Sequence, residues 1–278
     1  MNTPATTDRN VTTLIADGPV HLDLDDNGIA TIRLNRPEAA NAMDVRLFTA
    51  LHAALLRCHC EPGVHVVVLT GAGRNFCAGG DVRDFLAHAD RLPSHIKEVS
   101  SWFQAVSSTV IGLDVPVIAA VQGYAAGGGG LGLVGSCDFV IAGQSAKFMS
   151  GAVRVGMIPD GGLTTVLTQL VGLRKAMELT LTNVTIDADE ALRIGLITRV
   201  VPDDALMTET HALARTLADA APLALAECKH LLWNGLGSTV AHTLTEEARA
   251  VVRLAGTQDC IEGLHAVADR RRAVFGGT

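Results

Sequence analysis

Two short apolar runs, each followed directly by a glycine-rich loop, constrain the fold of this chain more than any other feature. The runs Val64 to Thr70 and Val115 to Val121 have the length and composition of strands buried on both faces of a sheet. The loops that follow read GAGRNFCAGGD over residues 71–81 and QGYAAGGGG over residues 122–130. Glycine lets backbone N–H groups approach a ligand closely, and a helix that begins at the second loop adds a partial positive charge. The pattern predicts two loops whose backbone amides bind a ligand.

Known phosphate-binding loops fit this pattern poorly. Gly71 and Gly73 begin a dinucleotide fingerprint, but Phe76 stands where the third glycine is required. Neither loop ends in the Gly-Lys-Ser/Thr of a P-loop. For either loop taken alone, a tight turn that packs a helix on a strand remains an equal alternative.

The remaining patterning predicts an α/β core over residues 19–200 and a helical C-terminal region over residues 201–278. Alternation around Asn27-Gly28 indicates a hairpin from His21 to Arg33, and helical periodicity runs from Ala42 to Cys58. Residues 1–18 are predicted to be a frayed leader, and residues 82–98 a mobile loop. The other expected elements are a helix over about 96–111, a helix ending near Ser136, a strand over 138–142, mostly helix after Leu163, a break at Val200–Pro202 and a new helix at Ala221-Pro222.

Composition excludes several classes of partner. The 278-residue chain has a net charge of −7 and no long basic run, so nucleic acid is not expected as a partner. No apolar stretch approaches the roughly 20 residues that span a bilayer. Six scattered cysteines favour reduced thiols and a cytoplasmic location, and Cys58-His59-Cys60 lacks a second ligand pair, so no metal site is predicted. Arg270-Arg271-Arg272 is interpreted as the cationic end of a helix, with contact to a phosphate-bearing ligand as the alternative.

The two loops belong to a longer series of motifs that covers nearly the whole chain past residue 20. Other members are NRP at 35–37, NAM at 41–43, CD at 137–138, AKF at 146–148, VGMIP at 155–159 and DCIEG at 259–263. In this order the series resembles the crotonase superfamily, the enoyl-CoA hydratase/isomerase family. The resemblance implies an α/β spiral of ββα turns with a helical C-terminal trimerisation region, forming a homotrimer or a dimer of trimers. It also implies an acyl-CoA thioester substrate and no separate cofactor, because coenzyme A is part of the substrate.

The same resemblance assigns roles to residues of both loops. Ala78 and Gly128 match the two residues whose N–H groups form the family's oxyanion hole. Such donors meet the charge that develops on a thioester carbonyl when a neighbouring proton is removed, and each is worth roughly 3 kcal/mol in comparable enzymes. Gly79 and Gly80 complete the binding loop, and Asp81 is expected to fix that loop rather than to perform chemistry. Arg36 is predicted either to contact CoA phosphate or to face solvent.

The acid–base groups are where this chain departs from its family. Leu131 and Ala152 stand where hydratases of the family carry two glutamates, and both are expected to line the acyl site. Hydration needs two groups, which activate the water and supply a proton. This chain lacks both glutamates. Asp160, in GMIPDGGL at 156–163, stands where hydratases usually carry glycine. This segment is similar to single-aspartate isomerases of the phenylacetate-degradation type, and apolar Leu131 and Ala152 would keep water out.

An enoyl-CoA isomerase that uses Asp160 is therefore the predicted function. The alternative for Asp160 is a helix N-cap before Gly161. The alternative functions are a hydratase with unusual catalytic groups, a thioester hydrolase or decarboxylase, and a CoA-ester-binding protein without catalysis.

Four further side chains are weaker candidates. His88 and His95 could approach the acyl group, although solvated loop histidines are the favoured interpretation. Tyr124 is expected to pack, and Cys77 to be small and buried.

Overall fold

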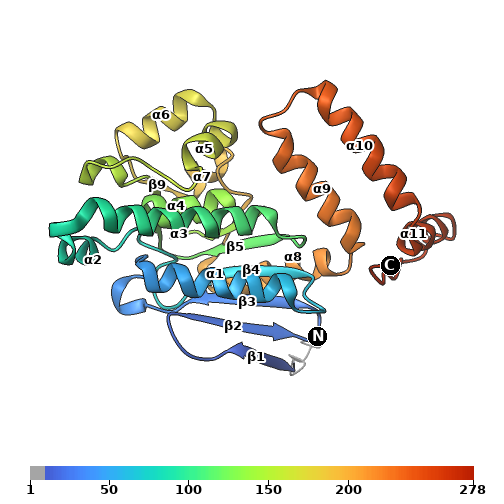
Figure 1. Ribbon diagram of the computed structural model, residues 1–278. Helices are drawn as coiled ribbons and strands as arrows, with labels where there is room; N and C mark the ends of the chain where they lie inside the picture. The colour runs from blue at the N-terminus through green and yellow to red at the C-terminus, as the bar shows by residue number, and fades with distance from the viewer. Residues whose placement is uncertain (1–9) are drawn as a thin grey trace.

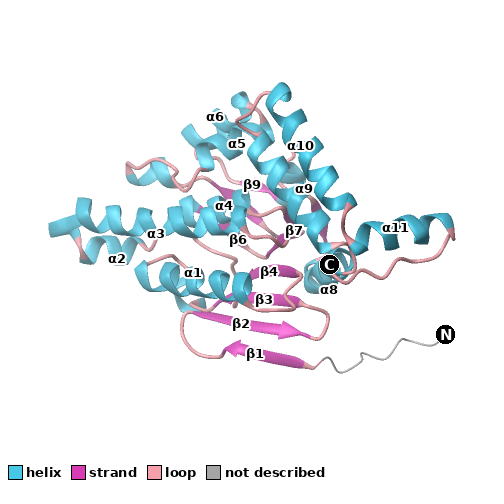
Figure 2. Cartoon of the chain, turned by 45° about the vertical axis from the view of Figure 1, so that its right-hand side comes forward, coloured by secondary structure: helices cyan, strands magenta, loops and turns pink. Residues whose placement is uncertain are grey.

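A computed structural model describes residues 10–278, and part of the predicted leader, residues 1–9, lies outside the described residues. The prediction of a frayed leader is wrong for the part that is described. β1 (Val11–Ile15) pairs antiparallel with β2 (Val20–Asp25) at the edge of the sheet (Figures 1 and 2), and the Thr13 hydroxyl donates to Asp23 Oδ1 at 2.8 Å. Pairing with an existing strand edge orders a segment whose own sequence carries little apolar pattern.

Within residues 10–278 the main sheet has seven strands in the order β1-β2-β3-β4-β5-β7-β10, parallel from β3 onward. The predicted hairpin is confirmed: β2 and β3 (Ile29–Leu34) meet at Asn27-Gly28, where Gly28 has φ +74°. Both predicted buried strands are also present. The remaining strands are β4 (Val66–Gly71), β5 (Val117–Val121), β7 (Phe139–Gly143) and β10 (Arg199–Val201).

Helices cover both faces of this sheet. Val67 and Leu69 of β4 pack on the side of α1 (Val45–Cys60), α3 (Leu92–Gly112) and α4 (Gly127–Ser136). Their neighbours Val66 and Val68 pack on α8 (Leu206–Ala218) on the opposite face. Successive side chains of a strand point to opposite faces, so a continuous apolar run is what a sheet covered on both sides requires.

Two predicted boundaries on the first face are wrong. α1 begins at Val45 rather than Ala42, because the Asp44 carboxylate caps it by accepting from the Leu47 amide at 2.7 Å. Residues 82–98 are not a loop: they form α2 (Val82–Ala87), η2 (Ala89–Arg91) and the start of α3. Asp81 caps α2 by accepting from the amides of Arg83 and Asp84.

A second sheet, β6-β8-β9, was not predicted. Its strands have only two or three residues each, too short for any alternation to be visible in sequence. They are β6 (Tyr124–Ala126), β8 (Lys147–Met149) and β9 (Ile186–Asp187). β6 continues directly into α4, so this sheet helps to place the second glycine loop.

The chain after Leu163 is mostly helical, as predicted, with the break at β10 and Pro202. Its helices are α5 (Leu163–Val171), α6 (Leu173–Leu181), α7 (Ala188–Arg193), α8, α9 (Pro222–Gly235), α10 (Val240–Ala255) and α11 (Gln258–Ala268). α8 packs on the sheet, whereas α9 to α11 lie beside the sheet and the helices that cover it (Figures 1 and 2). Lys229 and Trp233 of α9 bond Asp138, the residue before β7, at 2.9 and 2.7 Å, and so hold α9 against the main sheet. Among the described residues, no helix is long and apolar enough to cross a membrane.

Candidate active site

The two glycine loops lie against each other, backbone to backbone. Gly79 and Gly127 have φ values of +98° and +66°, and a Cβ on Gly79 would stand 2.9 Å from Gly127 Cα. The Ala126 amide donates to the Cys77 carbonyl at 2.9 Å, and the Cys77 amide to the Tyr124 carbonyl at 3.0 Å. Only glycine permits both the left-handed backbone and this approach. The loops therefore form one unit, which two separate sequence motifs do not show.

A buried asparagine fixes the shape of the first loop. The Asn41 amide group donates to the carbonyls of Ala72 and Asn75 at 3.0 and 2.8 Å, and its Oδ1 accepts from the Arg36 amide at 2.9 Å. Asn41 is fully buried and has φ +55°. No role was predicted for Asn41, because its position within the NAM motif is its only sequence signal.

Arg36 and Asp81 also belong to this framework. The Arg36 guanidinium pairs with Asp81 and Asp44, each at 3.0 Å, and donates to the Ala42 carbonyl at 2.6 Å. Arg36 does not face solvent, because its guanidinium donors are used inside the protein, and its contact with a CoA phosphate stays a prediction. Asp81 fixes the loop, as expected, by joining Arg36 to the first turn of α2.

The backbone amides of Gly80 and Gly128 are available to a ligand, whereas the amide of Ala78 is not. The Ala78 amide donates to the Ala40 carbonyl at 3.0 Å, so the prediction that this N–H is a free donor is wrong. Gly80, two residues on, has an amide with no hydrogen-bond partner among the described residues. Gly128 lies in the first turn of α4, where amides have no intrahelical acceptor, and the N-cap residue Ala126 provides no side-chain cap. Gly80 and Gly128 thus present the available N–H groups.

Asp160 lies directly against the second loop. A Cβ on Gly128 would stand 2.6 Å from Asp160 Oδ1, so the carboxylate touches the Gly128 backbone. Burial raises the pKa of the Asp160 carboxyl above its ordinary value, and a hydrogen bond from Ser100 partly offsets the rise. The N-cap alternative is wrong, since α5 begins at Leu163 with Gly162 as its cap residue.

These groups face a cavity of about 480 Å³ between the loops, α2, α3 and residues 149–160. Ala78, Gly80, Gly128, Ala152 and Asp160 line it, as do the apolar side chains of Phe48, Val82, Phe85, Ile96, Val99, Phe103, Met149, Val155, Met157 and Ile158. Of the predicted site residues, Gly79, Asp81, Leu131 and Arg36 do not line the cavity. Leu131 is buried inside α4. Within the described part of the chain, Asp160 is the one carboxylate in the wall.

The weaker candidates have mixed outcomes. His95 is not a solvated loop residue: it is 3% exposed on α3 and bonds Asp84. Tyr124 does not pack, being 44% exposed. Cys77 is buried, as expected, and burial raises the pKa of its thiol to about 12, which leaves it unreactive.

The arginine run lies just beyond the end of α11. Arg271 pairs with Glu262 through two bonds of 2.6 and 2.7 Å, and Arg272 pairs with Asp219. The run therefore ties the end of the chain to α11 and to the residue after α8.

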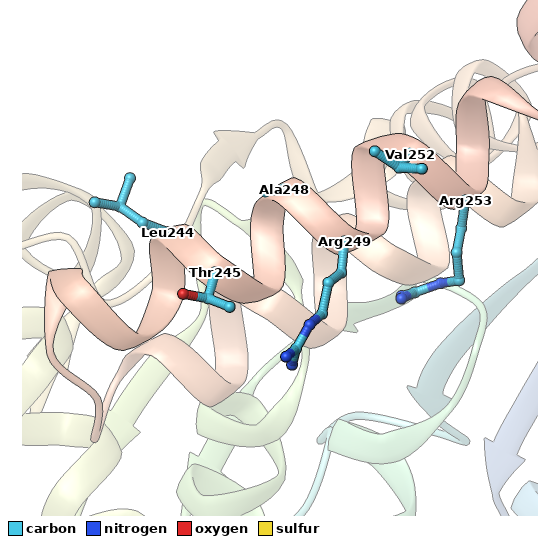
Figure 3. Close-up of a pocket in the computed structure, with 6 residues that line it drawn as sticks. All are labelled: Leu244, Thr245, Ala248, Arg249, Val252 and Arg253. Atoms are coloured by element: carbon cyan, nitrogen blue, oxygen red, sulfur yellow. The ribbon is translucent and has the colours of Figure 1, made fainter.

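A larger hollow of about 690 Å³ lies over one face of α10 (Figure 3). Its lining is Leu244, Thr245, Ala248, Arg249, Val252 and Arg253. None of these six residues is an acid, and all come from a single helix. The hollow is an open helix face, and the chemistry belongs to the cavity at the glycine loops.

Comparison with known proteins shows the family of this chain. Residues 25–278 match the sequence model of the enoyl-CoA hydratase/isomerase family. The chain belongs to the enoyl-CoA hydratase/isomerase family. A probable enoyl-CoA hydratase of Rhodobacter capsulatus is 37% identical over 250 residues, covering 90% of this chain and 95% of that protein. The crotonyl-CoA hydratase of Syntrophomonas wolfei is 34% identical, covering 89% and 94%.

Solved structures of the enoyl-CoA hydratase/isomerase family share the fold. The crystal structure of an enoyl-CoA hydratase from Bacillus anthracis superposes with a TM-score of 0.89 at 32% identity, covering 94% of this chain and 100% of that one. The predicted crotonase-like α/β fold with a helical C-terminal region is therefore confirmed. The relatives named here are hydratases, so the narrower resemblance to single-aspartate isomerases is not confirmed.

Proposed function

We propose that this enzyme shifts the double bond of an enoyl-CoA thioester from C3–C4 to C2–C3, with Asp160 as its acid–base group. The observation that carries the proposal is the composition of the cavity wall: one carboxylate, with a pKa raised by burial, among side chains that are apolar apart from Ser100 and Arg154. A double-bond shift needs one group that takes a proton and returns it elsewhere. A base with a raised pKa is suited to both transfers.

In the proposed reaction the Asp160 carboxylate removes a proton from C2. The electron pair moves into the thioester and places negative charge on its carbonyl oxygen. The protonated Asp160 then delivers the proton to C4, the double bond forms between C2 and C3, and the carbonyl is restored. No water enters the balance, and the mostly apolar wall disfavours its entry.

The amides of Gly80 and Gly128 are proposed to bind the charged oxygen. Both glycines line the cavity, and the Cβ position of Gly127 lies 3.7 Å from the Gly80 nitrogen, so the two donors come from touching loops. The start of α4 adds its partial positive charge at Gly128. Gly80 here replaces Ala78, whose amide is engaged with Ala40.

Hydration of a 2-enoyl-CoA is the second candidate, and the printed names of the relatives favour it. Against it stand Leu131 and Ala152, the first buried in α4 and the second contributing a methyl group to the wall. A hydratase built on this wall would activate water with Asp160 alone.

The purified enzyme should be given 3-enoyl-CoA and 2-enoyl-CoA separately, and the products followed by mass and ultraviolet absorbance. Isomerisation leaves the mass unchanged and produces a conjugated thioester, whereas hydration adds the mass of water. Asp160→Asn should lower turnover by about 10²–10⁴. Asp204→Asn, an exposed aspartate on η4, is the matched control and should turn over normally. Addition of water to 2-enoyl-CoA at a much higher rate than isomerisation would establish the second candidate instead.

We also propose that α9, α10 and α11 form the interface of a homotrimer or of a dimer of trimers. These helices expose large apolar side chains, including Leu232, Val240, Leu244, Val252 and Val267, each at least 60% exposed. Exposed apolar area of this kind is typical of a surface that another protein covers. Sedimentation velocity of the purified protein measures the oligomer directly.

A further inference from the structure

Three potential metal ligands converge outside the cavity, where α2 meets α3. Asp84 is on α2, His88 ends that helix, and His95 is on α3. One donor atom from each residue lies within 4.8 Å of the donor atoms of the other two. Among the described residues, no other group of three His, Cys, Asp or Glu side chains is gathered in this way.

The two histidine rings lie face to face. They stack with centroids 3.9 Å apart and an interplanar angle of 18°. His88 Nδ1 faces Asp84: it lies 2.9 Å from the Asp84 carbonyl oxygen and 3.4 Å from Asp84 Oδ1, so Nδ1 is the His88 nitrogen beside the Asp84 carboxylate.

Asp84 and His95 complete the set. His95 Nε2 lies 2.5 Å from Asp84 Oδ2, and the His95 ring is buried on α3. An ion between these two atoms would replace the proton that they share. The Asp84 and His88 side chains remain 22% and 28% exposed, so an ion can reach the group from solvent.

We propose that Asp84, His88 and His95 bind a divalent transition-metal ion, with Zn²⁺ as the expected occupant. Two imidazoles and one carboxylate suit Zn²⁺, Co²⁺ and Ni²⁺ rather than Mg²⁺ or Ca²⁺, which prefer oxygen ligands. Metal–ligand distances of about 2.0–2.2 Å place ligand atoms about 3–3.5 Å apart. Because the two rings are stacked, the partly exposed His88 ring would turn out of the stack to direct a nitrogen lone pair at the ion that His95 binds. Three protein ligands leave a fourth position for water.

The ion would act on the wall of the cavity. Val82 and Phe85 of α2 and Ile96 and Val99 of α3 line the cavity next to the ligands. A metal that joins α2 to α3 therefore fixes the wall against which an acyl chain would pack. The site does not depend on which reaction the enzyme catalyses.

The test is titration of metal-stripped full-length protein with Zn²⁺ by calorimetry, and with Co²⁺ by visible absorbance. Cys60→Ser/Cys228→Ser serves as the background, because these two cysteines are exposed and could bind Zn²⁺ themselves. One equivalent should bind, and saturating Zn²⁺ should raise Tm by roughly 5 °C. Co²⁺ should show the intense d–d bands of a four-coordinate ion.

His88→Gln should weaken Zn²⁺ affinity at least tenfold and remove the Tm shift, and Asp84→Asn should do the same. His88 is partly exposed, so His88→Gln is expected to fold even if a change at buried His95 is not tolerated. His59→Gln, on exposed α1 surface, is the matched control and should bind as the background protein does. Absence of a one-to-one complex below about 10 μM, or equal binding by His88→Gln and His59→Gln, overturns the proposal.

Discussion

α4 and α10 are both rich in apolar or small residues, yet they use them in opposite ways. In α4 every residue from Gly129 to Ser136 is buried, and the start of the helix faces the cavity. In α10, Ala250 is the buried residue, while Leu244, Val251 and Val252 are at least 60% exposed. The first region is complete within one chain. The second has the composition of an interior surface without the neighbours that would bury it.

The difference explains why the two regions are expected to respond differently to mutation. Around α4, the constraint is distance: backbone atoms of Gly79 and Gly127 are in contact, and any added carbon must displace them. Along α10, the constraint is polarity, because the exposed face has room for other side chains but needs apolar ones to bind a second copy. Changes of volume should damage the first region, and changes of polarity the second.

The largest effect is expected from Leu244→Ser/Val252→Ser on α10. Burying each side chain in an interface is worth about 1.5–3 kcal/mol, so the double change should dissociate the proposed oligomer at micromolar concentration. Sedimentation velocity measures this. Val11→Ser, which changes an equally apolar exposed residue on β1, should leave the oligomer intact. A wild-type monomer, or an undisturbed oligomer in the double variant, would contradict the proposed interface.

The second-largest effect is expected from Gly79→Ala, which should lower both stability and turnover. The φ of +98° costs about 1–3 kcal/mol for alanine, and the new Cβ would meet the Ala126 carbonyl at 2.8 Å. Because the Gly80 amide follows directly, turnover should fall about 100-fold, as expected for a displacement of roughly 1 Å. Thermal unfolding and steady-state kinetics measure the two losses.

Gly235→Ala on α9 is the control for this change. A Cβ there would meet nothing within 4 Å, and alanine suits a helix better, so stability should rise slightly. If Gly79→Ala behaved like Gly235→Ala, the close contact between the loops would not be a requirement of the site.

The smallest effect concerns the pH dependence of stability. The pKa of Asp160 is raised in the folded protein, so keeping its carboxylate charged costs folding free energy above that pKa. Asp160→Asn removes this cost and should raise Tm at pH 8. The difference in Tm between the variant and the wild type should narrow as pH falls through the raised pKa of Asp160. It should vanish below about 3.9, the ordinary pKa of aspartate. A gap that stays constant with pH would show that burial does not perturb this carboxyl.

Much of the fold could be predicted because its signals are local. Apolar runs identified β4 and β5, and Asn27-Gly28 identified the first hairpin. β1, β6, β8, β9 and β10 were missed because short or edge strands are defined by their partners rather than by their own pattern. α2 was missed because its cap, Asp81, was interpreted only as part of the glycine loop.

The sequence by itself determined that two glycine loops follow two buried strands. Through the family resemblance it also indicated that Leu131 and Ala152 replace two glutamates and that Asp160 stands at a usual glycine position. Only the tertiary structure decided which amides are available, since Ala78 donates to Ala40 whereas Gly80 has no acceptor. It also decided that Asp160 touches Gly128, and that Asp84, His88 and His95 converge. Periodicity and motif order are properties of the linear sequence. Hydrogen-bond occupancy and proximity depend on segments brought together in space, which no single stretch of sequence encodes.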